Sequence, residues 1–316
     1  MILESTLNSE LFVMKTEWNM IDETCFTDLL SISYFFQKTE NNKMRTICKK
    51  MAGIGICLLF ATYLASCSLI EYHPYDLESD DQPTNWNQKN IDLLAKKDDN
   101  ADTLRFIFMG DTQRCYDETQ DFVNAVNKRN DIDFVIHGGD ITDFGMSKEY
   151  TWIHRIMKNL KVPYVALIGN HDIVGHGNDV YKKIYGNLNF SFVYRKTRFI
   201  CLNTNALEFD YSTPVPDFDF MMSFMKDSAD VKRTIVVMHA PPYGDEFNNN
   251  SALMFNYVTE QYKNLKFCLH AHNHVQTVTD YFKNGILYYG CEDISKRTYM
   301  LFTLTGDTYS YSVVKF

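Results

Sequence analysis

The chain has 316 residues, of which 45% are hydrophobic and 22% are charged, and its formal net charge is -9. This length and apolar content suit one large folded domain or two small ones, with ample material for a core. The acidic balance argues against a general nucleic-acid-binding protein, because such a protein needs basic surface to displace counterions from phosphates.

The stretch from Met44 to Cys67 has the pattern of an export signal. A basic segment with Arg45 and two lysines precedes an apolar run that ends at Leu64. That run is too short to span a bilayer comfortably. Leu64-Ala65-Ser66-Cys67 resembles the bacterial lipoprotein cleavage signal, which implies cleavage before Cys67 and lipid attachment to its thiol. The alternative is a buried helix with a chance cysteine. We therefore expect a lipid-anchored protein of the bacterial cell envelope, periplasmic or surface-exposed.

This interpretation divides the chain into four parts. Because a signal peptide begins near the initiator methionine, residues 1–43 are predicted to be a mis-annotated upstream extension, with translation starting at Met44 or Met51. Residues 44–67 form the signal peptide. Residues 68–102 are polar and read as a tether leading into a short helix, and residues 103–316 form the folded domain.

The cysteines give no sign of a disulfide or zinc framework. Cys201 and Cys268 lie in apolar, strand-like runs, which predicts buried free thiols. No Cys-x-x-Cys pattern indicates zinc or redox chemistry.

Along residues 103–316, apolar strand patterns alternate with helical ones, which is typical of an α/β sheet with crossover helices. Helices are expected at about 116–129 and 148–160. The strand patterns are "LRFIFMG", "DFVIHGGD", "PYVALIGNHD", "RFICLNTN", "RTIVVMHAPP", "LKFCLHAHNH" and "GILYYGCED". The closing stretch "YMLFTLTGDTYSYSVVKF" predicts a hairpin that turns at residues 305–307.

Polar side chains follow five of these strands where each apolar run ends. They are Asp111, Gln113, Asp140, Asn170, His171, His239, His272 and His274. Each alone suits an ordinary loop residue. Because ligands gather at the carboxyl ends of strands in an open α/β sheet, their joint recurrence indicates one shared site.

Three histidines, His270, His272 and His274, stand close together in "KFCLHAHNHVQT". In an extended segment, alternate side chains share a face about 6 to 7 Å apart, whereas a helix would turn them away from each other. A shared task for His272 and His274 therefore requires extended backbone. Imidazole is the commonest metal ligand in proteins; the alternative is a polar turn with solvated histidines.

The order of the motifs resembles that of the calcineurin-like metallophosphoesterase superfamily. They are "GDTQ" at 110–113, "GDITD" at 139–143, "GNHD" at 169–172, His239 in "VMHAPP", and "AHNH" at 271–274. The resemblance covers about residues 104 to 293. It implies an α/β sandwich of two mixed β-sheets packed face to face and flanked by helices, with metals at one edge.

The resemblance also implies two divalent metal ions, Mn, Fe or Zn, about 3.5 to 4 Å apart. One ion would be held by Asp111, Gln113, Asp140 and His274. The other would be held by Asp140, Asn170, His239 and His272, so that Asp140 bridges both. His171 would face the substrate and protonate the leaving oxygen, with Asp172 orienting its ring. His270 matches no ligand position and is expected to be structural.

Two residues depart from the family pattern. Gln113 replaces a histidine and offers an amide oxygen, a poorer ligand for a transition metal. Ala271 replaces a glycine, which matters only if that position needs a positive φ.

The resulting hypothesis is an envelope-anchored, metal-dependent phosphoric ester hydrolase. It would cleave a phosphomonoester or phosphodiester by attack of a metal-bridging hydroxide. The alternative is a catalytically impaired metal- or ligand-binding protein of the same fold, and a nuclease is disfavoured by the acidic balance. Segments 176–196, 208–220 and 243–256 are rich in Tyr, Phe and Asn. They would either line a substrate cleft or pack on the surface.

Overall fold

The structure is a computed structural model that describes residues 42–66, 73–76, 84–99, 101–210, 212–226 and 230–316. The chain divides into two compact units, residues 1–72 and 73–316. In the first unit the described part is one helix, α3 (Asn42–Ser66). Cys67, and with it the predicted lipid attachment point, lies outside the described residues, as does most of the predicted upstream extension.

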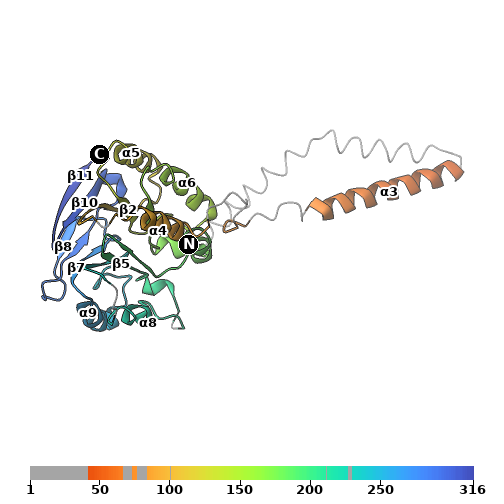
Figure 1. Ribbon diagram of the computed structural model, residues 1–316. Coiled ribbons are helices and arrows are strands. Elements are labelled where there is room, and N and C mark those ends of the chain that lie inside the picture. The colour runs from red at the N-terminus through yellow and green to blue at the C-terminus, as the bar shows by residue number, and fades with distance from the viewer. Residues whose placement is uncertain (1–41, 67–72, 77–83, 100, 211, 227–229) are drawn as a thin grey trace, which may run out of the picture. The chain divides into compact units, whose positions relative to one another are not determined.

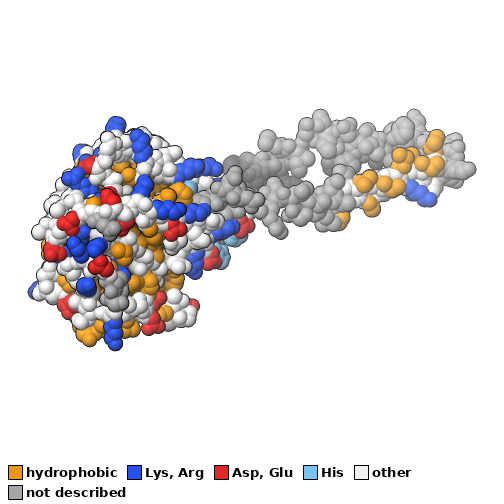
Figure 2. Space-filling view, viewed as in Figure 1, with side chains coloured by type: hydrophobic (Ala, Val, Ile, Leu, Met, Phe, Trp, Pro, Cys, Tyr) orange, Lys and Arg blue, Asp and Glu red, His pale blue; other side chains and the backbone are white. Residues whose placement is uncertain are grey.

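Helix α3 carries apolar side chains that are exposed to solvent, among them Ile47, Met51 and Phe60. Hydrophobic side chains, coloured orange, are visible along the helix (Figure 2). Among the helices that the structure describes, none has both the length and the hydropathy needed to cross a bilayer.

The second unit is an α/β sandwich (Figure 1). One sheet has five strands in the order β11-β10-β1-β2-β3 and the other has six in the order β4-β5-β6-β7-β9-β8. The strands are β1 (Thr103–Met109), β2 (Phe134–His137), β3 (Tyr164–Ala166), β4 (Phe190–Tyr194), β5 (Thr197–Leu202), β6 (Arg233–Met238), β7 (Leu265–His270), β8 (Thr277–Thr279), β9 (Tyr288–Gly290), β10 (Thr298–Thr305) and β11 (Thr308–Lys315). The helices described in this unit are α4 (Trp86–Lys97), α5 (Tyr116–Val126), α6 (Ser147–Met157), α7 (Gly177–Ile184), α8 (Phe218–Met222) and α9 (Ala252–Glu260).

Strand alternation builds the three apolar layers of this unit. On β1, Phe106 and Phe108 enter the core between the sheets, whereas Ile107 and Met109 face the opposite side. Successive side chains of a strand point to opposite faces, so a strand that is apolar at every position is covered on both sides. The outer face of the five-stranded sheet packs on α5, α6 and α7. The outer face of the six-stranded sheet packs on α8 and α9.

The predicted sandwich of two mixed sheets flanked by helices is confirmed. The closing hairpin is also confirmed, since β10 pairs with β11 and Thr305 faces Thr308 across the turn. Cys201 and Cys268 are buried free thiols, as predicted. Strands β4 and β8 were not predicted. Segment 176–196 forms α7 and β4, and its Tyr181 and Phe192 lie in the core, so these aromatic residues serve packing and do not line a cleft.

The predicted start of the folded domain at Thr103 is wrong. The short helix expected in residues 68–102 exists as α4, but it is part of the sandwich. Its Asn87 side chain donates a hydrogen bond to the Ala166 carbonyl at 2.8 Å and accepts one from the Ala166 amide at 2.9 Å. This pairing satisfies the backbone of the edge strand β3, which would otherwise present free hydrogen-bonding groups. The polar composition of the segment conceals this role.

His154 on α6 links acid stability to the packing of α4. Its ring lies 4.5 Å from that of Trp86, and its Nδ1 lies 3.0 Å from the Tyr164 hydroxyl. Burial, with a smaller contribution from Lys158, lowers the pKa of His154 to about 4. The unfolded chain takes up this proton near its ordinary pKa of about 6.5. Stability is therefore lost as pH falls from 6.5 towards 4, by about 1.4 kcal/mol per pH unit at most.

We expect the His154→Asn variant, which keeps an acceptor near the Nδ1 position, to show a shallower loss of stability between pH 6.5 and 4. The check is the urea unfolding free energy of metal-free protein at several pH values. His137, whose pKa burial lowers to about 3, keeps its own contribution, so some pH dependence persists. A slope identical to that of the wild type would contradict the assignment.

Candidate metal centre

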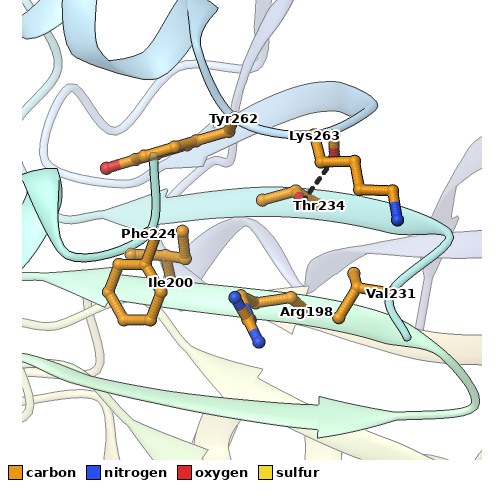
Figure 3. A pocket seen from close by; sticks show the side chains of 7 residues that line it. All are labelled: Arg198, Ile200, Phe224, Val231, Thr234, Tyr262 and Lys263. Atoms are coloured by element: carbon orange, nitrogen blue, oxygen red, sulfur yellow. Dashed lines mark hydrogen bonds between the residues drawn. The ribbon is translucent and has the colours of Figure 1, made fainter. Parts of the chain in front are cut away.

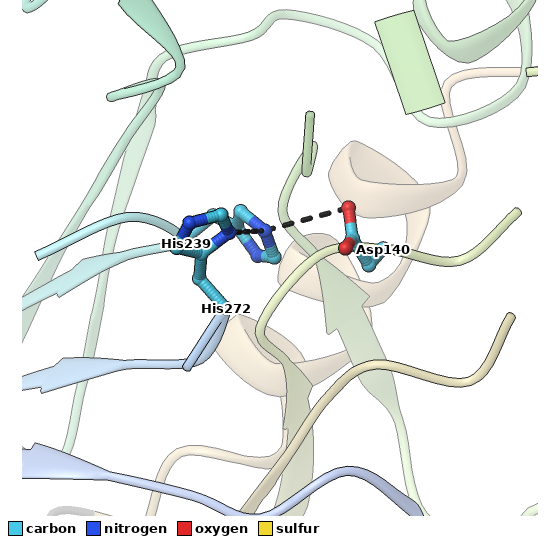
Figure 4. Close-up of side chains that lie close together, drawn as sticks. All are labelled: Asp140, His239 and His272. Atoms are coloured by element: carbon cyan, nitrogen blue, oxygen red, sulfur yellow. Dashed lines mark hydrogen bonds and ion pairs between the residues drawn. The ribbon is translucent and has the colours of Figure 1, made fainter. Parts of the chain in front are cut away.

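The site residues follow parallel strands from both sheets. In one sheet β1, β2 and β3 are parallel, and in the other β6 and β7 are parallel. Their carboxyl ends therefore carry the loops that begin after β1, β2, β3, β6 and β7 to one edge of the sandwich. Figure 4 shows Asp140 from one sheet opposite His239 and His272 from the other.

One group of candidate ligands consists of Asp140, His239 and His272, whose ligand atoms lie within 4.8 Å of one another. The Asn170 Oδ1 joins it, at 3.0 Å from His239 Nε2 and 3.1 Å from His272 Nδ1. The His239 Nδ1 lies 2.9 Å from the Gly138 carbonyl. Because a carbonyl only accepts, Nδ1 carries the proton of the neutral ring, and the lone pair of Nε2 faces the group and can bind a cation. The four residues predicted for one metal therefore converge.

The second group consists of Asp111, Asp140 and His274, again with ligand atoms within 4.8 Å of one another. The predicted fourth member, Gln113, donates from Nε2 to Asp140 Oδ2 at 3.3 Å. Asp140 belongs to both groups, which is the position required of a bridging carboxylate. Within the described residues, the Asp111 Oδ2 and Gln113 Oε1 atoms are buried and have no hydrogen-bond partner. Buried oxygens left without a donor fit a cation, which satisfies them.

The pKa shifts within the two groups also fit a bound cation. Burial raises the pKa of Asp111, and the neighbouring Asp140 carboxylate adds to this effect against the opposing action of His274. Burial alone would lower the pKa of His239, but the Asp140 carboxylate raises it to about 9. Two nearly buried carboxylates side by side repel each other unless positive charge is supplied. A divalent cation supplies that charge without a proton.

The backbone is strained at four candidate ligands. Asp111, Asp140, His272 and His274 have φ values of 54°, 56°, 70° and 55°. Each such conformation costs about 1–3 kcal/mol for a residue other than glycine, and such positions gather at functional sites. The prediction that His272 and His274 share an extended segment is wrong: both follow β7 in left-handed turns. The turns direct the two rings into different groups.

The two residues flanking this turn have structural positions. Ala271 is buried and is not among the residues with positive φ, so the methyl that replaces the motif glycine causes no backbone strain, as expected. His270 is buried, and its Nδ1 lies 3.0 Å from the Ala271 carbonyl. It is a member of neither ligand group, and burial lowers its pKa to about 4. This fits the structural role expected for it.

His171 lies beside the two groups and belongs to neither of them. Its amide donates to Asp140 Oδ1 at 3.1 Å, and its ring Nδ1 lies 3.0 Å from the Asp143 carbonyl and 3.7 Å from Asp143 Oδ1. The carbonyl contact assigns the proton to Nδ1. The ring is therefore oriented by Asp143.

The role predicted for Asp172 is wrong. Its fully buried carboxylate accepts hydrogen bonds from the Gly169, Ile141 and Thr142 amides and from the Thr142 hydroxyl. Asp172 thus joins the turn after β2 to the turn after β3, and supports the backbone of Asp140 without orienting His171. The residue that does so, Asp143, is the last residue of "GDITD". The place of Asp143 in this motif was the signal in the sequence that could have identified it.

Asp143 also forms a salt bridge with Arg114. The guanidinium donates to both carboxylate oxygens, at 2.7 and 2.6 Å. The Asp143 side chain is 7% exposed, whereas that of Arg114 is 71% exposed. A bidentate pair of this kind fixes the carboxylate geometrically. The Arg114 guanidinium therefore holds Asp143 in place from the solvent side, next to the His171 ring.

Gly169 makes room for Asp140. A Cβ built on Gly169 would lie within van der Waals overlap of the Asp140 carboxylate and amide. We expect Gly169→Ala to displace Asp140 and to destabilise the fold by about 1–3 kcal/mol, the usual cost of overpacking. Thermal unfolding and cation content per chain are the measurements. Retention of wild-type cation content would contradict the close approach.

A separate small cavity lies far from these groups. It has a volume of about 10 Å³ and is lined by Arg198, Ile200, Phe224, Val231, Thr234, Tyr262 and Lys263 (Figure 3). Arg198 and Thr234 are near the amino ends of β5 and β6, opposite the carboxyl ends that carry the candidate ligands. This volume holds about one water molecule, so it is not a substrate site.

A two-sheet sandwich with two adjoining groups of candidate metal ligands at its strand ends is the architecture of a metallophosphoesterase. The chain matches the calcineurin-like phosphoesterase family model over residues 104–276, which is more than half of its length, and it belongs to that family.

Among solved structures, the chain is similar to GAP50, the anchor in the inner membrane complex of Plasmodium. The TM-score is 0.51 and the identity 13%, over 67% of this chain and 84% of that one. It is also similar to the purple acid phosphatase PPD1 of yellow lupin (Lupinus luteus), with a TM-score of 0.52 and 12% identity over 68% of this chain and 52% of that one. At these identities the likeness shows the fold.

A curated relative is the probable cyclic nucleotide phosphodiesterase XBJ1_0953 of Xenorhabdus bovienii. It is 28% identical over 87 residues, which cover 28% of this chain and 33% of the relative. The match therefore spans about one third of the length of that protein.

Proposed function

We propose that this chain is a dinuclear-metal phosphoesterase that hydrolyses a phosphomonoester or phosphodiester. The observation that carries the proposal is the convergence of Asp140 on two ligand groups, one with His239 and His272 and the other with Asp111 and His274. Bound divalent cations would supply Lewis-acid chemistry, by lowering the pKa of water and neutralising charge on the phosphoryl oxygens. Mn, Fe or Zn suits this mixture of carboxylate, amide and imidazole ligands.

The chain's own contribution to the reaction centres on His171. Its Nδ1 proton points at the Asp143 carbonyl, 3.0 Å away, and the Nε2 side of the ring is left for the substrate. In the protonated ring, Nε2 gives its proton to the leaving oxygen as the phosphorus–oxygen bond breaks. The Asp143 carboxylate Oδ1 lies 3.7 Å from the same Nδ1.

We also propose that the protein is anchored to the bacterial cell envelope through lipid on Cys67, as its Leu-Ala-Ser-Cys sequence implies. An enzyme anchored in this way would meet its substrate at the membrane surface. Mass spectrometry of the membrane-extracted protein tests this directly. An acylated Cys67 at the mature N-terminus supports the anchor, and a soluble protein with an unmodified Cys67 would refute it.

Hydrolysis of two generic substrates tests the enzymatic proposal. Full-length protein is freed of metal by chelation, then assayed with p-nitrophenyl phosphate and bis(p-nitrophenyl) phosphate in the presence of Mn²⁺, Zn²⁺ or Fe²⁺. We expect metal-dependent turnover, with the faster substrate identifying the ester class. If cations bind without turnover of either ester, the chain is instead a binding protein of this fold, and the replacement of histidine by Gln113 would be the reason.

A further inference from the structure

The loop after β6 reaches back to the candidate metal centre through Asp245. The His272 Nε2 lies 2.7 Å from Asp245 Oδ1. On the other side of the same ring, Nδ1 lies 3.1 Å from Asn170 Oδ1 and 3.3 Å from His239 Nε2. The ring therefore stands between the loop carboxylate and the other candidate ligands.

The contact with Asp245 decides which nitrogen of His272 can bind a cation. An ionised carboxylate only accepts hydrogen bonds, so the neutral ring carries its proton on Nε2. Its lone pair is then on Nδ1, the atom that faces Asn170 and His239. Histidine ligands of metals commonly donate their other N–H to a carboxylate in this way, which fixes the tautomer and orientation of the ring.

We propose that Asp245 is a positioning residue that holds His272 in the Nδ1-ligating state. This inference rests on the metal centre of the proposed function. Asp245 is a member of neither ligand group, and its side chain is 86% exposed whereas that of His272 is 13% exposed.

The loop presents Asp245 in a defined position. The Glu246 amide donates to Asp245 Oδ1 at 3.2 Å, and the Glu246 carbonyl accepts from the Ala206 amide at 2.8 Å. The Tyr243 amide donates to Asn249 Oδ1 at 2.7 Å and closes the loop on itself. Anything that moves this loop also moves the hydrogen-bond acceptor of His272, so the loop and the cation site are coupled.

A purely surface role for Asp245 predicts a different outcome from a positioning role. An exposed ion pair contributes about 0–1 kcal/mol to stability and leaves cation binding unchanged. Loss of the carboxylate that accepts a hydrogen bond from a metal-binding histidine lowers metal affinity by about 10–100-fold. Cation affinity, measured without turnover, therefore separates the two.

The test compares full-length wild type with Asp245→Asn and with Asp307→Asn, which removes another exposed carboxylate, 82% exposed, at the β10–β11 hairpin. Metal-free protein is titrated with Mn²⁺ and with Zn²⁺ against a competing chelator, and unfolding free energies are measured in parallel. We expect Asp245→Asn to lower the affinity for one of two bound cations by about 10–100-fold. The second cation and the stability of the metal-free protein should change little, and Asp307→Asn should behave as wild type.

Equal cation affinities in Asp245→Asn and wild type would overturn the inference while leaving the phosphoesterase proposal intact. The predicted loss of affinity in a chain that hydrolyses neither ester would support the positioning role of Asp245 and refute the proposed phosphoesterase activity. A wild-type chain that binds no cation would refute both.

Discussion

Replacing Asp140 with Asn is expected to remove cations from both ligand groups and to lower turnover by about 10³-fold or more. Asp140 is the residue that the two groups share, and its carboxylate is nearly fully buried. An amide has one neutral acceptor oxygen where the carboxylate offers two charged ones. Metal ions contribute several kcal/mol to phosphoryl transfer, and each 1.4 kcal/mol is about tenfold in rate.

Cation content per chain and turnover of both aryl phosphate esters test this expectation. A matched control is Asp230→Asn, since the Asp230 side chain is 81% exposed and pairs with Lys196, outside both ligand groups. Circular dichroism and the melting temperature establish that each variant is folded. An Asp140→Asn chain that keeps two cations and wild-type turnover would show that this carboxylate bridges nothing.

The His171→Ala variant is expected to lose turnover by about 10²–10⁴-fold, the usual contribution of a general acid, while keeping its cations. His171 belongs to neither ligand group, and its side chain is 39% exposed, so its removal leaves the centre and the core in place. The loss should be larger for phenyl phosphate than for p-nitrophenyl phosphate, because the poorer leaving group depends more on proton donation.

Steady-state kinetics with the two leaving groups, together with cation content, check this expectation. His176→Ala is the matched control, because that histidine is exposed and its ring makes a tilted contact with His73 and an edge-on contact with Tyr75. An unchanged turnover in His171→Ala would assign the proton donor elsewhere. A loss of cations from this variant would show that His171 acts as a ligand.

The convergence of the candidate ligands was predictable from the sequence because it depends on strand direction. Asp111 and Asp140 follow the parallel strands β1 and β2, while His239 and His272 follow the parallel strands β6 and β7. Hydrophobic strand patterns identify these ends without knowledge of side-chain packing. The sandwich follows from the same patterns, since strands such as β1 and β6 are apolar on both faces.

The features that the sequence did not predict depend on local backbone conformation and long-range contacts. The left-handed turns at His272 and His274 break the strand periodicity from which an extended segment was inferred. The contact of Asp245 with His272 joins residues 27 positions apart, and no local pattern encodes it. The docking of α4 through Asn87 depends on a polar side chain binding an edge strand, which composition alone reads as a tether.

The most direct test of the proposed dinuclear phosphoesterase is the number of divalent cations per chain that turnover requires. Metal-free, full-length protein is titrated with Mn²⁺ while hydrolysis of bis(p-nitrophenyl) phosphate and p-nitrophenyl phosphate is followed. With both ligand groups occupied, turnover should rise until two equivalents are bound and then level off. No turnover at any number of equivalents, with Mn²⁺ or with Zn²⁺ and Fe²⁺ in its place, would contradict the proposed function.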